Sequence, residues 1–468
     1  MTIEEALAVV DKYLYPQHLN HVQEIVLRTA WQGQSYRECA KTHGYTPEYI
    51  KAVGYKLWKL LSSAFGEPIS KNNLQSVLRR HLSLPKLEIP DHQQSSEEQI
   101  TTQSSQLTAQ EAEEESLMVK THQRWGEAVD TSIFYGRTEE LMTLEQWILP
   151  DRCRLIGLFG MGGIGKTALS CKLAKQIQGE FEYLFWVSLR NALPLQELLS
   201  DLLLFLSNQQ ETEEANLSPT VGGRISQLID YLRRSRCLVV LDNVDAILCS
   251  GTYAGNYRQG YQEYGELFQQ VAEVEHQSIL LLTSREILKE VDLLEGKKLP
   301  IRSLQLHGLK EEQVKSIFIS KGCCVNWKNK LKVLINECEG NPLMIKAFAS
   351  TINRLFDNSF SSHIDYGKDF LTIIPEIKQI LDYHWLRLSK LEKLIMYWIA
   401  GSQKTISLQE IQNQYQLIYR KEGLEVIESI ISLTRRFLII KTSLGFRPIN
   451  LFKTYINIKM SSCNFLDK

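Results

Sequence analysis

The sequence lacks the features of a secreted, zinc-binding or membrane protein. Nine cysteines, an odd number, are spread over 468 residues without a CxxC pair, which argues against both a disulfide framework and a zinc ribbon. The most apolar run, residues 199–207, is too short and too interrupted to cross a bilayer. The amino terminus is acidic and amphipathic, unlike a secretory signal. We therefore expect a cytoplasmic protein with no membrane partner.

The chain also has little net charge and no internal repeat of 20 to 50 residues, but its charge is unevenly distributed. The formal net charge is −1, whereas residues 88–118 alone hold eight acidic residues and no Lys or Arg. This stretch is rich in Gln, Ser, Thr and Glu, and cannot bury enough apolar surface to offset its ordering entropy. The sequence thus predicts a disordered acidic linker at 88–124 between two folded parts.

Residues 1–87 show helical periodicity and a surplus of four basic residues. Thr46 as N-cap, Pro47 at the first helical position and Glu48 in the first turn agree on a helix start after the break at Gly44. The apolar stripe of this helix is Ile50, Val53, Leu57, Leu60, Leu61 and Ala64. The residues that lie largely outside this stripe, on the outer face of the helix, are Lys51, Tyr55, Lys56, Trp58, Lys59 and Ser62.

This pattern predicts an all-α, helix-turn-helix-like N-terminal domain at 1–87. A basic, aromatic outer face makes DNA a possible partner through residues 35–63. A small helical bundle with solvated lysines would give the same pattern, so the two interpretations stay open. The segment resembles the N-terminal helix-turn-helix module of vWA-MoxR-associated proteins, which implies a protein effector as the other candidate partner.

Buried strands separated by helices follow from residue 153, as in a mostly parallel sheet. The expected strands are 153–160, 183–189, 237–242 and 278–284. The first of them runs into GLFGMGGIGKTALS, residues 157–170, which contains the pattern GxxxxGK[ST]. A strand, a glycine-rich loop and a helix in this order predict a phosphate-binding P-loop.

The chemistry of the P-loop follows from its residue types. Gly160, Gly162, Gly163 and Gly165 let backbone NH groups turn around phosphate oxygens. Lys166 pairs with the terminal phosphates of a nucleotide, and the helix that begins there points its positive end at the anion. Thr167 supplies its hydroxyl to Mg²⁺, so the expected cofactors are ADP or ATP with Mg²⁺.

Two further strand ends fit a nucleotide site. CLVVLDNVD ends an apolar strand in Asp242, the residue type that holds the water shell of Mg²⁺ beside a P-loop. SILLLTSRE places Arg285 at the carboxyl end of another strand, where a γ-phosphate is sensed. Asn243 follows Asp242, and an amide cannot take a proton from an attacking water, so the sequence predicts slow hydrolysis.

Six motifs in order resemble those of the NB-ARC family of STAND-class AAA+ NTPases. They are FYGRTEEL (134–141), GMGGIGKT, VSLRN (187–191), LVVLDN, LLTSR (281–285) and EGNPLMIK (339–346). The resemblance covers roughly residues 125–445. It implies a nucleotide-binding domain at 125–300, a helical lid at 301–368 and a winged helix at 369–460. The fold class is then a multidomain α/β protein: a three-layer parallel-sheet domain with two lids, preceded by the all-α domain.

The resemblance also assigns residues to roles. It places Tyr135, Gly136 and Arg137 by the adenine and ribose, Arg190 and Arg285 at the γ-phosphate, and Pro342 against the base. The full expected nucleotide-binding set is Tyr135, Gly136, Arg137, Gly160, Gly162, Gly163, Ile164, Gly165, Lys166, Thr167, Ala168, Arg190 and Pro342. The expected catalytic set is Lys166, Asp242, Asn243 and Arg285. Thr167 and Asp242 are expected to hold Mg²⁺ through water.

The sequence departs from the family pattern near its end. Ile449 stands where family members have a polar residue that touches the β-phosphate, and isoleucine cannot donate a hydrogen bond. About twenty residues follow the expected winged helix, which leaves no room for the repeat array that serves as sensor in many members.

We expect an ADP/ATP-controlled signalling switch that binds ADP when closed, hydrolyses ATP slowly and forms homo-oligomers in its ATP state. Three alternatives stay open. One is a DNA-binding transcription regulator whose oligomeric state is set by nucleotide. Another is a motor-type AAA+ ATPase with rapid turnover, against which Asn243 argues. The third is a truncated, non-signalling remnant of a longer sensor protein.

Overall fold

A computed structural model describes residues 2–14, 19, 21–43, 47–71, 73–82, 121–207, 217–323, 328–356, 374–420 and 423–463. These residues belong to two compact units, Met1–Lys120 and Thr121–Lys468. Thr46 and the part of the expected linker up to residue 120 lie outside the described residues. Within the described ranges, none of the helices has the length and apolar character needed to cross a membrane.

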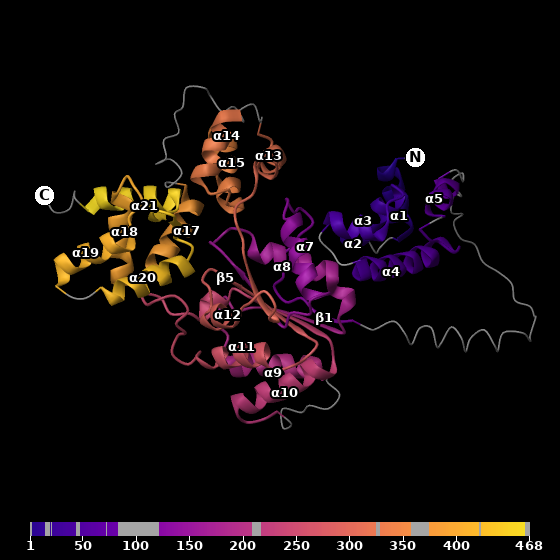
Figure 1. Ribbon diagram of the computed structural model, residues 1–468, viewed down its shortest axis with the longest axis horizontal. Coiled ribbons are helices and arrows are strands. Elements are labelled where there is room, and N and C mark those ends of the chain that lie inside the picture. Colours follow the sequence, from indigo (N-terminus) through magenta and orange to yellow (C-terminus); the bar gives the residue numbers. More distant parts are fainter. Residues whose placement is uncertain are drawn as a thin grey trace, which may run out of the picture. The chain divides into compact units, whose positions relative to one another are not determined.

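The first unit is helical, as the sequence predicts. Its helices are α1 (Ile3–Leu14), α2 (His21–Trp31), α3 (Tyr36–His43), α4 (Pro47–Phe65) and α5 (Leu74–Leu82) (Figure 1). Helix α4 begins at Pro47, and Ile50, Leu57 and Leu61 of its expected stripe are fully buried. The apolar face of α4 therefore forms the core of this unit with the helices that pack against it.

Part of the expected outer face of α4 is used for packing inside the unit. The indole Nε1 of Trp58 donates to the hydroxyl of Tyr36 at 2.7 Å, which ties α4 to α3. The hydroxyl of Ser62 accepts from the backbone NH of Ile69 at 2.7 Å. Gly54 permits the close approach of the two helices, because a Cβ there would lie 2.7 Å from the Tyr36 hydroxyl. Tyr55, by contrast, is 72% exposed.

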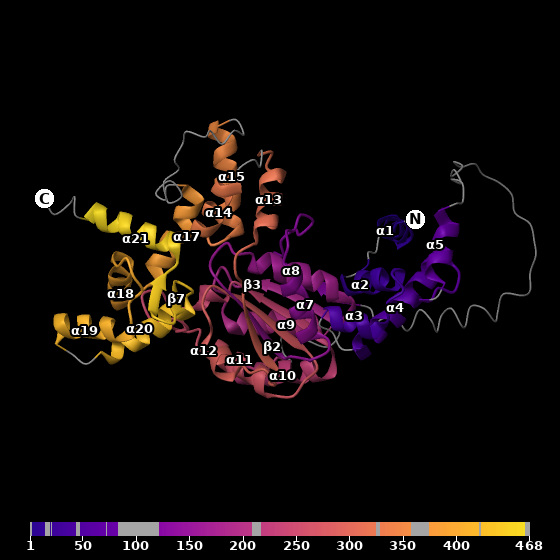
Figure 2. The ribbon, with the colours of Figure 1, turned by 45° about the horizontal axis from the view of Figure 1, so that its top comes forward.

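The second unit is built on a six-stranded sheet in the order β1-β3-β4-β5-β2-β6, with every neighbouring pair parallel (Figure 2). The strands are β1 (His122–Arg124), β2 (Leu155–Phe159), β3 (Tyr183–Ser188), β4 (Cys237–Asp242), β5 (Ile279–Ser284) and β6 (Ile301–Gln305). Every residue of β2, β4 and β5 is buried, as expected for central strands covered on both faces.

Helices cover both faces of this sheet. Figure 1 shows α7 (Thr138–Ile148) and α8 (Lys166–Ile177) on one face, and α9 (Leu195–Leu206), α10 (Val221–Arg234) and α11 (Glu263–Glu273) on the other. Two separate apolar clusters, one under each helix layer, form the core on the two faces. The short α12 (Lys289–Leu294) follows β5. The predicted three-layer parallel α/β architecture is confirmed.

The sheet is wider than the sequence indicates, because its two outer strands lie beyond the expected 125–300 boundaries. Strand β1 falls in residues assigned to the linker, and β6 falls in residues assigned to the lid. Both are edge strands, paired on one side with β3 and β2 respectively. All three residues of β1 are exposed and polar, so it carries no apolar run from which a strand could be predicted.

Two helical groups follow the sheet. The first contains α13 (Glu311–Ser320), α14 (Lys328–Glu337) and α15 (Pro342–Phe356). The second, here called the C-terminal subdomain (residues 374–463), contains α17 (Pro375–Arg387), α18 (Lys390–Gly401), α19 (Leu408–Tyr419), α20 (Leu424–Arg435), the antiparallel hairpin of β7 (Ile439–Thr442) and β8 (Gly445–Pro448), and α21 (Asn450–Cys463). One apolar cluster runs through both groups and includes Met161 of the P-loop.

A buried cluster of charges joins the C-terminal subdomain to the sheet. The carboxylate of Glu286, two residues beyond β5, accepts from Arg387 of α17 and from Arg436 at 2.9 Å. Arg436 also lies 3.3 Å from Glu392 of α18. All four side chains are at most 5% exposed. Because a buried charge left without its partner is costly, this cluster favours one docked position of the subdomain.

The Glu286 cluster can be tested by removing one charge. Glu286→Gln leaves two buried arginines short of a counter-charge, and breaking a buried pair in this way costs about 3–5 kcal/mol. We expect hydrogen exchange to rise at least about a hundredfold at Gly251 and Ala254, whose NH groups donate to the Arg387 carbonyl and the Ser432 hydroxyl of the C-terminal subdomain.

Arg435→Gln is the matched control, because the Arg435–Asp292 pair joins the same two parts but is 25% and 38% exposed. Exposed pairs are worth about 0–1 kcal/mol, so exchange should change less than about fivefold. Equal exchange in the two variants would contradict the role given to Glu286.

Candidate functional site

The glycine-rich loop lies between the end of β2 and the start of α8. Gly160, Gly163 and Gly165 have φ of 147°, 79° and 100°, a region that side-chain-bearing residues rarely adopt. Helix α8 begins at Lys166, so its unpaired NH groups and positive dipole end face the loop. Ala168 is half-buried in the first turn of the same helix. The backbone is therefore shaped to hold an anion.

Lys166 is folded onto its own loop. Its ammonium donates to the carbonyls of Gly160 at 2.8 Å and Met161 at 3.1 Å, and the residue is 8% exposed. Burial lowers the pKa of Lys166 to about 8, helped by the positive charge of Arg285 and opposed by Asp245 and Asp242. A phosphate would replace these carbonyls with a formal negative charge and stabilise the protonated lysine.

Asp242 collects hydroxyl and amide donors at the end of β4. It accepts from Thr167 at 2.8 Å, from Thr283 at 2.5 Å and from the Asn243 side chain at 2.7 Å. Burial raises the pKa of Asp242, and the bonds from Thr283 and Thr167 oppose that shift. The Thr167 hydroxyl and the Asp242 carboxylate are adjacent, an oxygen donor set that fits Mg²⁺ held partly through water.

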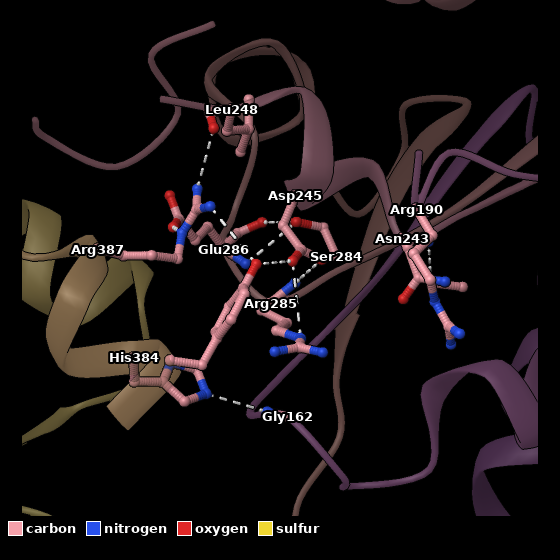
Figure 3. Close-up of polar contacts among 12 residues, drawn as sticks. Gly162, Arg190, Asn243, Asp245, Leu248, Ser284, Arg285, Glu286, His384 and Arg387 are labelled. Atoms are coloured by element: carbon pink, nitrogen blue, oxygen red, sulfur yellow. Dashed lines mark hydrogen bonds and ion pairs between the residues drawn. The ribbon is translucent and has the colours of Figure 1, made fainter. Parts of the chain in front are cut away.

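Asn243 supports Asp242 and has a backbone conformation that suits an asparagine. Its φ of 59° is in the left-handed region, which asparagine tolerates better than most residues. Its amide also donates to the Ser188 hydroxyl at 3.1 Å. Arg190 is exposed, and Figure 3 shows it beside Asn243, apart from the group formed by Arg285, Asp245 and His384. The structure does not bring the two expected arginines together.

Arg285 is held by Asp245 and by Tyr383 of α17. Its backbone NH donates to Asp245 at 3.1 Å, and its Nε lies 3.6 Å from the same carboxylate. The guanidinium sits over the Tyr383 ring at 4.0 Å from the centroid. The Tyr383 hydroxyl donates to Asp245 at 2.8 Å, which places all three groups in one contact network (Figure 3).

Both helical groups contact the P-loop backbone. The Asn341 side chain donates to the Gly162 carbonyl at 2.9 Å, and the Leu343 NH donates to the Gly163 carbonyl at 3.3 Å. From the C-terminal subdomain, His384 Nε2 accepts the NH of Gly162 at 3.2 Å. Hydrogen bonds to Gly162 therefore come from segments about 180 and 220 residues further along the chain.

A cavity of about 380 Å³ adjoins the loop on the side of the C-terminal subdomain. The P-loop contributes Met161 and Ile164 to its wall, and the β7–β8 region contributes Ile449. The rest of the wall consists of Gln305, Leu306, His307, Gly308, Glu339, Asn341, Thr434, Phe437, Ile439, Ile440 and Lys441. Ile449 thus presents an apolar side chain to the space beside the loop.

The residues expected near the adenine contact the P-loop and the helical groups. Arg137 is buried, donates to the Ile164 carbonyl at 2.9 Å and pairs with Glu140 at 2.7 Å. Its neighbour Gly136 has a φ of 66°, and a Cβ there would lie 2.6 Å from the Gln313 side chain. Tyr135 is half-buried, packs against the core of the helical groups and has Lys346 over its ring at 5.8 Å. Pro342 opens α15 directly after Asn341.

Four contact residues were not identified from the sequence: Asn341, Tyr383, His384 and Glu286. Asn341 stands inside the EGNPLMIK motif beside Pro342, and this position is the one sequence feature that could have indicated a contact with the nucleotide site. Tyr383 and His384 lie in the helical segment LDYHWLRL, which mixes polar and apolar residues, so periodicity alone cannot say which side chains face a site.

Comparison with protein families gives two matches. Residues 1–81 match the vWA-MoxR associated protein N-terminal HTH, and residues 137–251 match the NB-ARC domain. The chain contains an NB-ARC domain. The P-loop and Asp242 lie within the NB-ARC match, and the predicted resemblance is confirmed for residues 1–81 and 137–251.

The chain is also similar to named proteins. The chain is 43% identical over 344 residues to an uncharacterized WD repeat-containing protein of Nostoc sp., covering 72% of this chain and 27% of that protein. It is 26% identical over 201 residues to a disease resistance protein of Vitis rotundifolia, covering 42% of this chain and 13% of that protein. The chain therefore spans about a quarter or less of the length of these relatives.

Solved structures with a similar chain course include the Walker-type ATPase of Pyrococcus abyssi, with a TM-score of 0.47 and 15% identity over 69% of this chain and 96% of that one. A STAND protein with a tetratricopeptide repeat sensor from Pyrococcus horikoshii gives a TM-score of 0.34 and 16% identity over 71% of this chain and 44% of that one.

The low pKa of Lys166 predicts a pH dependence of nucleotide binding. The unliganded lysine loses its proton as pH rises through about 8, whereas a bound phosphate raises the pKa again. Affinity should therefore be highest below pH 8 and fall by about tenfold per pH unit above it. Titration with a fluorescent ADP between pH 7 and 9.5 measures this slope.

Lys166→Arg is the control for the pH prediction, because a guanidinium stays protonated throughout this range. Any affinity that this variant retains should not change with pH. A flat wild-type affinity between pH 8 and 9.5 would contradict the assignment to Lys166.

Proposed function

We propose that the chain is an ADP/ATP-controlled molecular switch, with ADP held while the two helical groups are closed over the P-loop. One observation carries this proposal: Asn341 and His384, from the two groups, hydrogen-bond to Gly162 of the loop itself. Docking of the C-terminal subdomain therefore engages an NH group of the phosphate-binding loop, whereas Asn341 binds the Gly162 carbonyl, an acceptor that a phosphate does not use. A ligand that interacts differently with the docked and undocked states shifts the equilibrium between them.

The proposal divides the second unit by function. Residues 125–300, extended by β1 and β6, hold the nucleotide; residues 301–368 act as the helical lid; and residues 369–460 act as the winged helix. The helix-hairpin-helix order of α20, β7, β8 and α21 supports the last assignment. The N-terminal unit, residues 1–87, contacts the effector.

The residues at the P-loop have distinct roles in this proposal. Bound Mg²⁺ supplies positive charge to the phosphates beside Thr167 and Asp242. Lys166 leaves the carbonyls of Gly160 and Met161 and donates to the terminal phosphate oxygens. Arg285 reads the γ-phosphate once Tyr383 has left its guanidinium. Arg190 is exposed and lies apart from Arg285, so it reaches the γ-phosphate only after its side chain or strand end has moved.

Hydrolysis is expected to be slow. The side chain next to Asp242 is the amide of Asn243, and it donates to Asp242. The nearest further acid, Asp245, is already engaged by Tyr383 and Arg285. Because neither Asn243 nor Asp245 offers a free carboxylate to take the proton of an attacking water, we predict a steady-state turnover below about one per minute. Phosphate release measured at several per second would contradict this prediction.

The function is tested by the nucleotide that the purified protein carries. After denaturation, chromatography of the supernatant should show ADP close to one mole per mole of protein. Lys166→Ala should carry none, because the loop loses the cation that binds the terminal phosphates. An empty wild-type site together with rapid turnover would show a continuously cycling ATPase instead of a switch.

The partners follow from the same proposal. In the ATP state the chain forms homo-oligomers, which brings N-terminal units together and raises their effective concentration. A protein effector is favoured over DNA for that unit, because Trp58 and Ser62 of the expected DNA-contacting face are used for packing between its own segments.

A further inference from the structure

His384 fills a position inside the nucleotide site that the proposed switch leaves unexplained. It lies on α17, is 3% exposed, and accepts the NH of Gly162 through Nε2 at 3.2 Å. That NH belongs to the loop whose backbone donors otherwise turn toward phosphate oxygens. A side chain from the C-terminal subdomain therefore takes a hydrogen bond that a phosphate would take.

The imidazole is surrounded by the groups that would hold a terminal phosphate. A Cβ placed on Gly162 would lie 3.4 Å from His384 Nε2 and 3.5 Å from Arg285 Nη1, so both side chains border the same point of the loop (Figure 3). Lys166 and Arg285, both positively charged, are close enough to affect the titration of His384. The ring therefore sits where an NH donor and two cations meet.

The environment keeps this imidazole neutral, as an acceptor must be. Burial holds the pKa of His384 well below its usual range, and the charges of Arg285, Lys166, Arg387 and Arg436 act in the same direction. A neutral ring with Nε2 unprotonated supplies one lone pair to the Gly162 NH. It is a weak substitute for a phosphate oxygen, which carries charge and attracts both cations.

We propose that His384 occupies the place of the terminal phosphate of a nucleoside triphosphate, which makes the docked state selective for the diphosphate. This inference rests on the proposed switch and adds the residue that distinguishes its two nucleotides. ADP leaves the Gly162–His384 bond intact, whereas ATP has to displace the ring.

Displacement of His384 would spread to Arg285 through the adjacent residue. Tyr383 precedes His384 on α17, stacks on the Arg285 guanidinium and donates to Asp245. A movement of α17 that withdraws the imidazole also withdraws the Tyr383 ring and breaks the Asp245 bond. Arg285 is then free to face the phosphate that has entered, so recognition of the triphosphate and undocking of α17 are one event.

The test compares two substitutions on the full-length protein after removal of bound nucleotide. His384→Ala removes both the acceptor and the volume of the ring, whereas His384→Gln keeps an acceptor at similar reach. Leu386→Ala is the matched control, because Leu386 lies on the same helix and is 69% exposed. Affinities for fluorescent ADP and for a fluorescent non-hydrolysable ATP analogue are measured with Mg²⁺.

We expect the wild type, His384→Gln and Leu386→Ala to favour ADP by at least about tenfold. His384→Ala should reduce the preference to within about threefold, and the change should come from tighter binding of the ATP analogue. An unchanged preference in His384→Ala, or one that falls only because ADP binds more weakly, would overturn the inference.

Hydrogen exchange of the Gly162 amide in the nucleotide-free protein gives a second readout, independent of affinity. Exchange should be faster in His384→Ala than in the wild type and in Leu386→Ala, because the acceptor of that NH is gone. Equal exchange would show that the bond does not form and would overturn the inference. Failure of the wild type to bind either nucleotide would overturn the proposed switch as well, which distinguishes the two failures.

Discussion

The docking of the C-terminal subdomain depends on the carboxylate of Glu286. It is the acid on the sheet side that faces Arg387 and Arg436, and these three side chains are almost completely shielded from water. Such a cluster stabilises one geometry, because any partial separation leaves a charge buried without its partner. That geometry brings Tyr383 to Asp245 and His384 to Gly162. The nucleotide site is therefore completed by residues that an ion-pair cluster, outside the P-loop, holds in place.

The parts of this protein that the sequence predicted well have a local physical cause. The P-loop follows from glycines, Lys166 and Thr167 placed directly after an apolar strand, all within one short segment. The central strands were found because burial on both faces requires continuous apolar runs. The two edge strands escaped the same reasoning: β1 is three exposed polar residues, and its strand geometry comes from pairing with Tyr183–Phe185 of β3.

The contacts that turn a phosphate loop into a candidate switch could not be predicted in this way. The partners of Gly162 lie at Asn341 and His384, and which residues of α15 and α17 face the loop is decided by how the helical groups pack. Arg285 was identified correctly as a strand-end cation, but its attachment to Asp245 and Tyr383 depends on that same packing. Tertiary arrangement, not residue type, gives these side chains their roles.

The central claim is that nucleotide identity sets the position of the C-terminal subdomain relative to the P-loop domain. The most direct measurement is a distance distribution by pulsed electron resonance, with genetically encoded spin labels at Lys175 of α8 and at Leu417 of α19, both exposed. The account predicts one narrow, short distance with ADP and a longer, broader distribution with Mg²⁺ and a non-hydrolysable ATP analogue. The same narrow distribution with both nucleotides, each shown to be bound, would contradict it.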